Sequence, residues 1–156
     1  MPNAHEPEMG VDADLDAVRI GGEVRAAGGL HTISGLLTLL GGVQVAGTVQ
    51  FARGAAEWIP YAFLVSGLVA LMCGTLTYRG KAPGAIVALV LSAVHLFGGG
   101  LWFFVLVGWG IGSLPVLLTP MFALGALALG AYVMPRILKI DAARKRLAAK
   151  GLSFGV

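Results

Sequence analysis

The fold is decided by one long apolar stretch, residues 82–135, which reads APGAIVALVLSAVHLFGGGLWFFVLVGWGIGSLPVLLTPMFALGALALGAYVMP and contains no Asp, Glu, Lys or Arg. An α-helix that crosses a bilayer needs about 20 apolar residues, because it rises 1.5 Å per residue across a hydrocarbon core of roughly 30 Å. The stretch is long enough for two such helices. Glycine and proline cluster in GWGIGSLP, residues 108–115. Such clusters mark turns, so we divide the stretch into spans at 82–106 and 114–134.

Two further charge-free stretches precede it and predict spans at about 26–52 and 58–78. The whole chain is 57% apolar and 12% charged, against roughly 45–50% and 25% in soluble domains. Its 156 residues suffice for one domain. The sequence therefore predicts an all-α fold, an integral membrane four-helix transmembrane bundle with short loops.

Charged residues flank the spans and predict the orientation of the chain. We expect an acidic segment at 1–25, a transmembrane domain at 26–135 and a basic tail at 136–156. Arg79 and Lys81 lie between the second and third spans, and the tail holds six more basic residues, whereas the other two loops hold only Arg53. Because Lys and Arg accumulate in cytoplasmic loops, we predict that both termini are cytoplasmic and that the membrane is a bacterial inner membrane.

The two polar ends of the chain carry opposite charge. We expect disorder over residues 1–10 and a short helix over 12–20, with Val11, Leu15 and Val18 on a face that contacts the membrane or a partner. The tail favours a helix that prolongs the fourth span or bends along the membrane. Its basic residues are predicted to contact lipid headgroups: Arg136, Lys139, Arg144, Lys145 and Arg146. Alternatively, the tail pairs with the acidic segment on the same side.

Small residues recur at four-residue spacing on three spans and predict close helix contacts, which drive packing in lipid. The predicted packing positions are Ser66, Ala70 and Gly74, then Gly84, Ala88 and Ser92, then Ala126 and Gly130. On the first span, small and polar residues share one face, which we expect to point inward: His31, Ser34, Thr38, Gly41, Val45 and Thr48.

His95 is the leading candidate for a functional site, because ionisable residues near the middle of a span are rare. By residue count it lies at the same depth as Thr38, so a structural contact between these two is one interpretation. A proton or ligand site is the other. His31 and Gln44 on the first span complete the candidate polar site.

The ionisable residues exclude several chemistries. His31 and His95 differ in depth by about 12 Å at 1.5 Å per residue, so one chain should not bind haem through both, although a haem with one ligand or shared between chains remains open. Cys73 and His31 are too few for a zinc site, and no metal site is expected. No acidic residue lies in a span, which disfavours an ion-coupled transporter. No catalytic triad or carboxylate pair is present, so the chain is not expected to be an enzyme.

The sequence therefore favours a non-enzymatic accessory or scaffold subunit of a membrane assembly. Its expected partners are the lipid bilayer and either copies of itself or other membrane subunits, and not nucleic acid. The first alternative is a small channel or carrier with a path along the polar face of the first span and His95. The second alternative is a haem- or quinone-binding membrane protein that uses His95.

Overall fold

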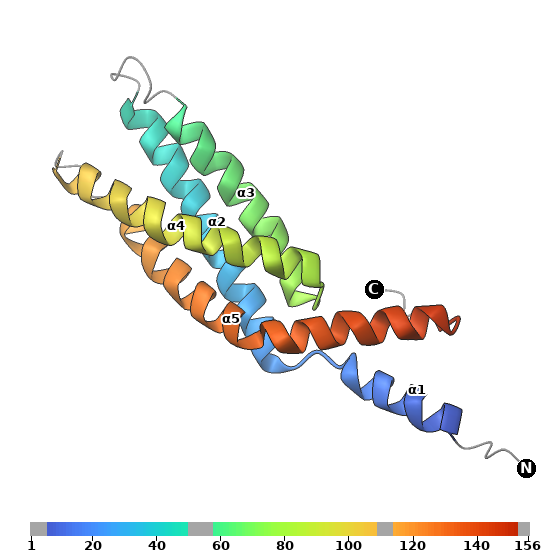
Figure 1. Ribbon diagram of the computed structural model, residues 1–156. Helices are drawn as coiled ribbons and strands as arrows, with labels where there is room; N and C mark the ends of the chain where they lie inside the picture. Colours follow the sequence, from blue (N-terminus) through green and yellow to red (C-terminus); the bar gives the residue numbers. More distant parts are fainter. Residues whose placement is uncertain (1–5, 50–57, 109–113, 153–156) are drawn as a thin grey trace, which may run out of the picture.

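The computed structural model describes residues 6–49, 58–108 and 114–152, and within these ranges it is helical without strands (Figure 1). Its five helices are α1 (Glu6–Ala17), α2 (Gly22–Val49), α3 (Ile59–Tyr78), α4 (Ala82–Gly108) and α5 (Leu114–Ala149). Four of them are long and apolar enough to cross a membrane. The predicted all-α four-helix transmembrane bundle is confirmed.

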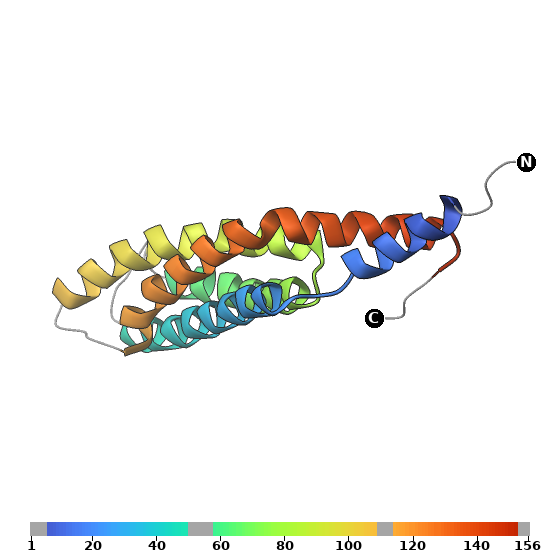
Figure 2. The ribbon, with the colours of Figure 1, turned by 90° about the horizontal axis from the view of Figure 1, so that it is seen from below.

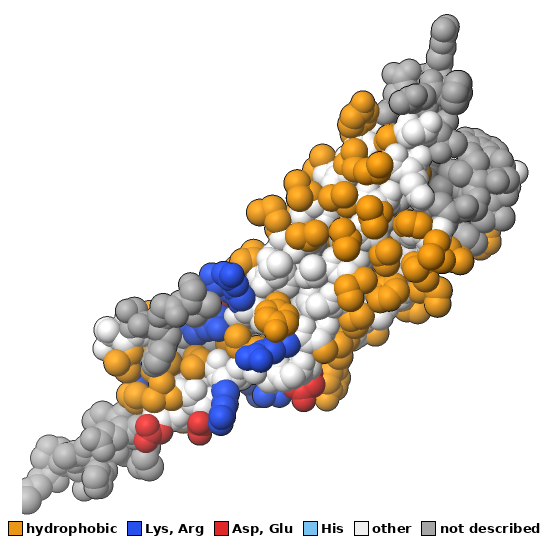
Figure 3. All heavy atoms as spheres, turned by 180° about the vertical axis from the view of Figure 1, so that it is seen from behind, with side chains coloured by type: hydrophobic (Ala, Val, Ile, Leu, Met, Phe, Trp, Pro, Cys, Tyr) orange, Lys and Arg blue, Asp and Glu red, His pale blue; other side chains and the backbone are white. Residues whose placement is uncertain are grey.

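The four long helices form one bundle in which α2 is central. It packs along α3 on one side and along α5 on another, while α4 packs along α5 and α3 (Figures 1 and 2). We call the end of the bundle at Gly22, Arg79 and Arg136 the charged end. Side chains of Lys, Arg, Asp and Glu gather there, whereas hydrophobic side chains cover the flank of the bundle (Figure 3). Such a flank suits hydrocarbon as the surrounding solvent.

Glycines hold α2 and α3 together along a seam that the sequence analysis missed. Gly28, Gly35 and Gly42 recur every seven residues on α2, a spacing that keeps one helix face on a partner. A Cβ added at Gly35 would lie 2.6 Å from the backbone nitrogen of Leu71, and one at Gly67 would lie 2.7 Å from that of Leu39. Such positions are sterically closed, so only glycine permits this approach.

Helix α5 is a single helix of 36 residues and is about 54 Å long at 1.5 Å per residue. The hydrocarbon core is only roughly 30 Å thick, so α5 is longer than a membrane crossing requires. The last turns of α5 extend beyond the bundle (Figure 1). The helix changes direction on the way (Figure 1). Pro135 accounts for the bend, since proline donates no backbone hydrogen bond and its ring crowds the carbonyl four residues earlier.

Helix α1 differs from its prediction in position. It covers Glu6–Ala17 rather than 12–20, and the disorder expected for residues 6–10 is wrong; residues 1–5 lie outside the described ranges. A proline and two acidic residues in the first turn suit a helix N-terminus. The face against α5 contains Asp14, which is 6% exposed, whereas Leu15 is 37% exposed. An ion pair with Arg146 lies on this face, while contact of the Val11, Leu15 and Val18 face with the membrane or a partner stays a prediction.

An apolar cluster joins α1's linker, α2, α4 and α5 at the charged end. Ile137 and Ile140 of α5 are fully buried against Val24 and Ala27 of α2 and against the start of α4. Gly80, in the turn between α3 and α4, has φ +67° and leaves room for Ile140 beside it. A side chain with a Cβ would strain this turn. The cluster therefore fixes where α5 leaves the bundle.

Candidate functional site

Two buried histidines and three hydroxyl side chains link α2, α3 and α4 in the middle of the bundle. Nδ1 of His95 lies 3.2 Å from Oγ1 of Thr38, and its Nε2 lies 3.2 Å from Oγ of Ser66. Nδ1 of His31 lies 2.8 Å from Oγ of Ser92. We call these five residues the histidine network. The contact between His95 and Thr38 matches the structural interpretation of the sequence, while any functional role of the site stays a prediction.

Each hydroxyl beside His95 also has a carbonyl acceptor in its own helix. In the neutral tautomer that carries its proton on Nδ1, Oγ1 of Thr38 donates to the Ser34 carbonyl at 2.8 Å and accepts from Nδ1–H of His95. Nε2 of His95 then accepts from the Ser66 hydroxyl. That hydroxyl has a second acceptor, the Phe63 carbonyl at 3.2 Å. If His95 gains a proton, Ser66 can rotate its hydroxyl to Phe63 and accept from Nε2–H, so the same heavy-atom positions accommodate both protonation states.

His31 and Ser34 each keep a buried polar atom without a partner. Among the described residues, Nε2 of His31 and Oγ of Ser34 have no hydrogen-bond partner, although both side chains are 1% exposed. Nε2 faces Gly130 of α5, where an added Cβ would lie 2.7 Å away. A buried polar group without a partner costs about 1–3 kcal/mol in proteins. The hydrogen-bonding capacity of the network, and of Ser34 beside it, is therefore not fully used.

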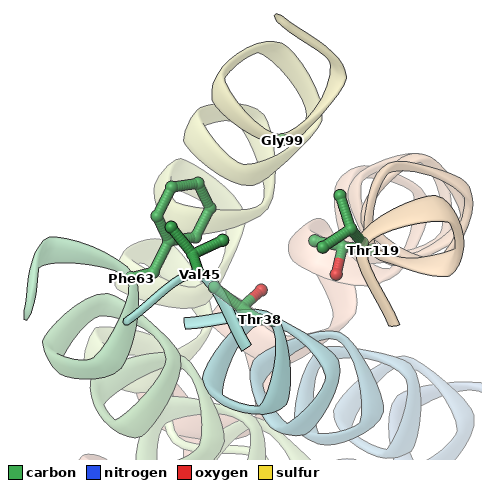
Figure 4. Close-up of a pocket in the computed structure, with 7 residues that line it drawn as sticks. Thr38, Val45, Phe63, Gly99 and Thr119 are labelled. Carbon is green, nitrogen blue, oxygen red and sulfur yellow. The ribbon is translucent and has the colours of Figure 1, made fainter. Parts of the chain in front are cut away.

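A small cavity lies beside the network and is lined by residues of α2, α3, α4 and α5 (Figure 4). Its volume is about 10 Å³, close to the least that holds one water molecule. Thr38 and Thr119 contribute hydroxyls to its lining, while Val45 and Phe63 contribute apolar walls. Thr119 donates its own proton to the Pro115 carbonyl at 2.8 Å, so both threonine oxygens remain acceptors. The lining suits one water that donates to them.

Gln44 is exposed on α2. Six residues separate it from Thr38, and at about 100° per residue this places it roughly 120° around the helix. Its part in the candidate polar site stays a prediction. The residues on the inward face expected for α2 are buried wherever the structure describes their side chains. The side chain of Thr48 is not among those described. That part of the sequence reasoning followed the helical period correctly.

The eight small residues chosen as packing positions lie at helix contacts. Seven are buried and Ser66 is half-buried. Ser66 and Ser92 do more than allow close approach, since their hydroxyls bond to His95 and His31. The sequence could have suggested this role, because serine in a span needs a hydrogen-bond partner.

The network does not fit haem. Both ring nitrogens of His95 contact hydroxyls. His31 bonds to Ser92 through Nδ1, and its other nitrogen, Nε2, lies close against Gly130 of α5, where the helices leave little space for a ligand. The cavity beside them is also far too small for a macrocycle. Within the described ranges, no group of three or more His, Cys, Asp or Glu residues could hold a metal ion.

The basic tail residues find protein partners at the charged end. Nη2 of Arg146 lies 2.6 Å from one carboxylate oxygen of Asp14, and its Nε lies 3.0 Å from the same oxygen. Lys150 approaches the other oxygen at 3.9 Å. The hydrogen bond from Arg146 lowers the pKa of Asp14, and the same bond raises the pKa of Arg146.

The remaining predicted headgroup residues each make at most one polar contact among the described residues, and all of them except Arg144 are exposed. Arg136 pairs with Glu23 at 2.9 Å, Lys145 pairs with Asp141 at 2.8 Å, and Arg144 donates to the Gly80 carbonyl at 3.5 Å. Lys139 is exposed. Exposed pairs contribute little individually, so these side chains can still meet headgroups, and their contact with lipid stays a prediction.

The fold and the site together define a class, a multi-pass helical membrane protein with a buried histidine network. No known protein family, curated protein or solved structure shows significant similarity to this chain. Any finer function must therefore be argued from the geometry.

Proposed function

We propose that this protein is a non-enzymatic accessory or scaffold subunit of a membrane assembly. The observation that supports this is a projecting arm, which we define as α1 together with residues 136–149 of α5 (Figure 2). The arm extends beyond the four-helix bundle, where a helix has no role in crossing the membrane. A structure that presents a fixed surface outside the bilayer suits a subunit that binds other chains.

The arm is held by burial as well as by charge. Ala143 and Leu147 of α5 are fully buried, and Asp14 of α1 lies against Arg146 with two hydrogen-bonded nitrogens. Bidentate arginine–carboxylate pairs fix orientation better than single contacts do. The arm therefore keeps one shape, which lowers the entropy cost of binding a partner.

The proposed location is the inner membrane of a bacterium, with the arm and both termini in the cytoplasm. The support is the placement of Arg79, Lys81 and the basic residues of α5 at one end of the bundle, because such residues stay on the cytoplasmic side.

Extraction into native lipid particles tests the assembly. We expect the wild-type protein to run larger than a monomer or with a second membrane chain. Lys139→Glu combined with Lys145→Glu should weaken this association, because it reverses the charge of the exposed basic residues of α5 in the arm. Asp16→Asn, on the exposed side of α1, leaves those basic residues unchanged; it is the matched control and should leave the association intact. A protein that is only ever monomeric, with nothing copurifying, would contradict the proposal.

A second candidate function is a path for protons or a small polar solute through the histidine network. The supporting observation is the Ser66 hydroxyl, which can serve either protonation state of His95. Purified protein in liposomes should then carry protons or solute in a pH-dependent way. His95→Gln should stop this flux, since an amide keeps hydrogen bonding but does not titrate. Thr77→Ala is the control, because the Thr77 hydroxyl bonds only within its own helix, to the Cys73 carbonyl. Equal flux in wild type and His95→Gln would refute the path.

A further inference from the structure

A groove opens on the outside of the bundle where α2 and α3 reach the charged end. Its lining is Gly29, Thr32, Ile33, Thr75, Tyr78 and Arg79, and its volume is about 500 Å³. Small-molecule sites in proteins commonly measure roughly 300–1,000 Å³. The groove is separate from the histidine network, whose residues do not line it.

Two adjacent glycines create the hollow. Gly28 contacts the backbone of Tyr78 and brings the two helices together, so this contact forms the floor. Gly29 faces outward, and within the described part of the chain no heavy atom lies within 4 Å of a Cβ placed there. Any larger side chain at Gly29 would occupy the groove without disturbing the floor.

The walls of the groove suit hydrocarbon. Oγ1 of Thr32 donates to the Gly28 carbonyl at 2.9 Å, and Oγ1 of Thr75 donates to the Met72 carbonyl at 2.6 Å. Both hydroxyl protons are therefore satisfied inside their own helices. Together with Ile33, these side chains form a wall that needs no polar partner from a ligand.

The rim of the groove is cationic. Arg79 lines it directly, and the guanidinium of Arg25 lies 6.0 Å from the centre of the Tyr78 ring. Arg25 is four residues before Gly29 on α2, so it lies about one turn nearer the charged end. Among the described lining residues there is no carboxylate. The nearest acidic residue in sequence, Glu23, pairs with Arg136 of α5.

We propose that this groove binds one anionic phospholipid, with its phosphate between Arg25 and Arg79 and an acyl chain along Gly29, Thr32 and Ile33. An apolar groove that ends in two guanidinium groups matches this ligand in both charge and polarity. Arginine favours phosphate oxygens because several N–H groups can bond them at once. Basic pockets between transmembrane helices are known to recognise acidic headgroups. The lipid would lie at the level where headgroups meet the hydrocarbon core.

Native mass spectrometry of the detergent-purified protein tests the site with two probes, phosphatidylglycerol and phosphatidylcholine. We expect one phosphatidylglycerol to bind at concentrations where phosphatidylcholine does not. Arg25→Gln combined with Arg79→Gln should weaken this binding at least about tenfold, which corresponds to roughly 1.4 kcal/mol. Gly29→Leu should weaken it similarly by filling the groove. Lys150→Gln, which removes a positive charge at the same end but outside the groove lining, should leave binding unchanged.

Three results would overturn the assignment. Equal binding of phosphatidylcholine would remove the role of charge, and undiminished binding by Gly29→Leu would remove the groove. A loss with Lys150→Gln as large as with the arginine variant would indicate only general attraction at the charged end. Inorganic phosphate serves as a further probe and should not displace the lipid at millimolar concentration. Full displacement would show that the two arginines alone account for binding, without an acyl chain in the groove. The slow labelling of the buried Cys73 thiol in every variant verifies that the bundle is folded.

Discussion

Replacing Gly35 with alanine tests the claim that backbone contact at the glycine seam stabilises the bundle. The added methyl group would lie 2.6 Å from the Leu71 nitrogen and 2.9 Å from the Gly67 carbonyl oxygen. Ordinary van der Waals contact begins at about 3.4 Å. Both neighbours are backbone atoms of α3 and cannot rotate away, so α2 and α3 must separate by as much as about 0.8 Å at this level.

The cost follows from that displacement. A gap of 0.5–1 Å forfeits about a quarter to a half of the dispersion energy of the atoms that face it, and inserting one methyl group into a packed core typically costs about 1–3 kcal/mol. Alanine recovers roughly 0.5–1 kcal/mol because it loses less backbone entropy than glycine in a helix. We therefore expect a net destabilisation of about 1–2 kcal/mol.

Cys73 provides the assay, because it is the only cysteine of the chain and is 8% exposed on α3. The rate at which a thiol reagent labels it in detergent, measured against temperature, reports opening of the bundle. Gly35→Ala should label at a lower temperature than wild type. Gly98→Ala is the matched control, since a Cβ there meets no described atom within 4 Å, and it should behave like wild type or better. If the two variants label alike, the seam does not stabilise the bundle as argued.

The remaining predictions concern the arm, the histidine network and the orientation. Asp14→Asn should undock α1 at pH 7, seen as faster amide hydrogen exchange in α1. In the wild type, the pKa of Asp14 lies below its ordinary value of 3.8 because Arg146 hydrogen-bonds to the charged form. The stabilisation from this pair is therefore complete above about pH 5, and it is lost as the pH falls below 4 through the lowered pKa; exchange that is already fast at pH 6 would contradict this. Gly130→Ala should displace the His31 ring, because the new methyl group would lie 2.7 Å from Nε2. NMR of the labelled histidines should show a shift for His31 and little change for His95, and the reverse result would refute the placement. Tags fused to either terminus should be protected from periplasmic protease in a bacterial host, and cleavage of either tag would refute the orientation.

The sequence predicts the four spans because the solvent imposes them. In hydrocarbon, every backbone polar group needs an internal partner, so an apolar stretch of sufficient length becomes a helix. The positions of charges then bound each span: α3 begins at Ile59 and ends at Tyr78, against the predicted 58–78. Where charges are sparse, the bounds are less accurate. Helix α2 begins at Gly22, within the segment expected to be polar and separate.

The pairing of helices could not be predicted in the same way. The inward face of α2 can be recognised in the sequence as a row of polar and small residues. A second row, of glycines spaced by seven residues, could equally mark a helix contact, and sequence alone does not say which helix each row meets. The pair of Asp14 with Arg146 joins residues 132 positions apart. Such a contact depends on the direction that α5 takes after the bend at Pro135. Packing at Ile137 and Ile140 fixes that direction, and local sequence alone does not predict it.

The two faces of α2 differ in how they can move, and this bears on both candidate functions. Along α3, the closest contacts at Gly35 and Gly67 are with backbone atoms of the facing helix, which cannot rotate away. Toward α4, the contacts are hydroxyl–imidazole hydrogen bonds, at Thr38 with His95 and at Ser92 with His31, and these can exchange partners by rotation of a hydroxyl. Any opening of the bundle should therefore separate α4 from a fixed α2–α3 pair. A scaffold requires this interface to stay closed and a conducting path requires it to open, so the mobility of α4 relative to α2 distinguishes the two.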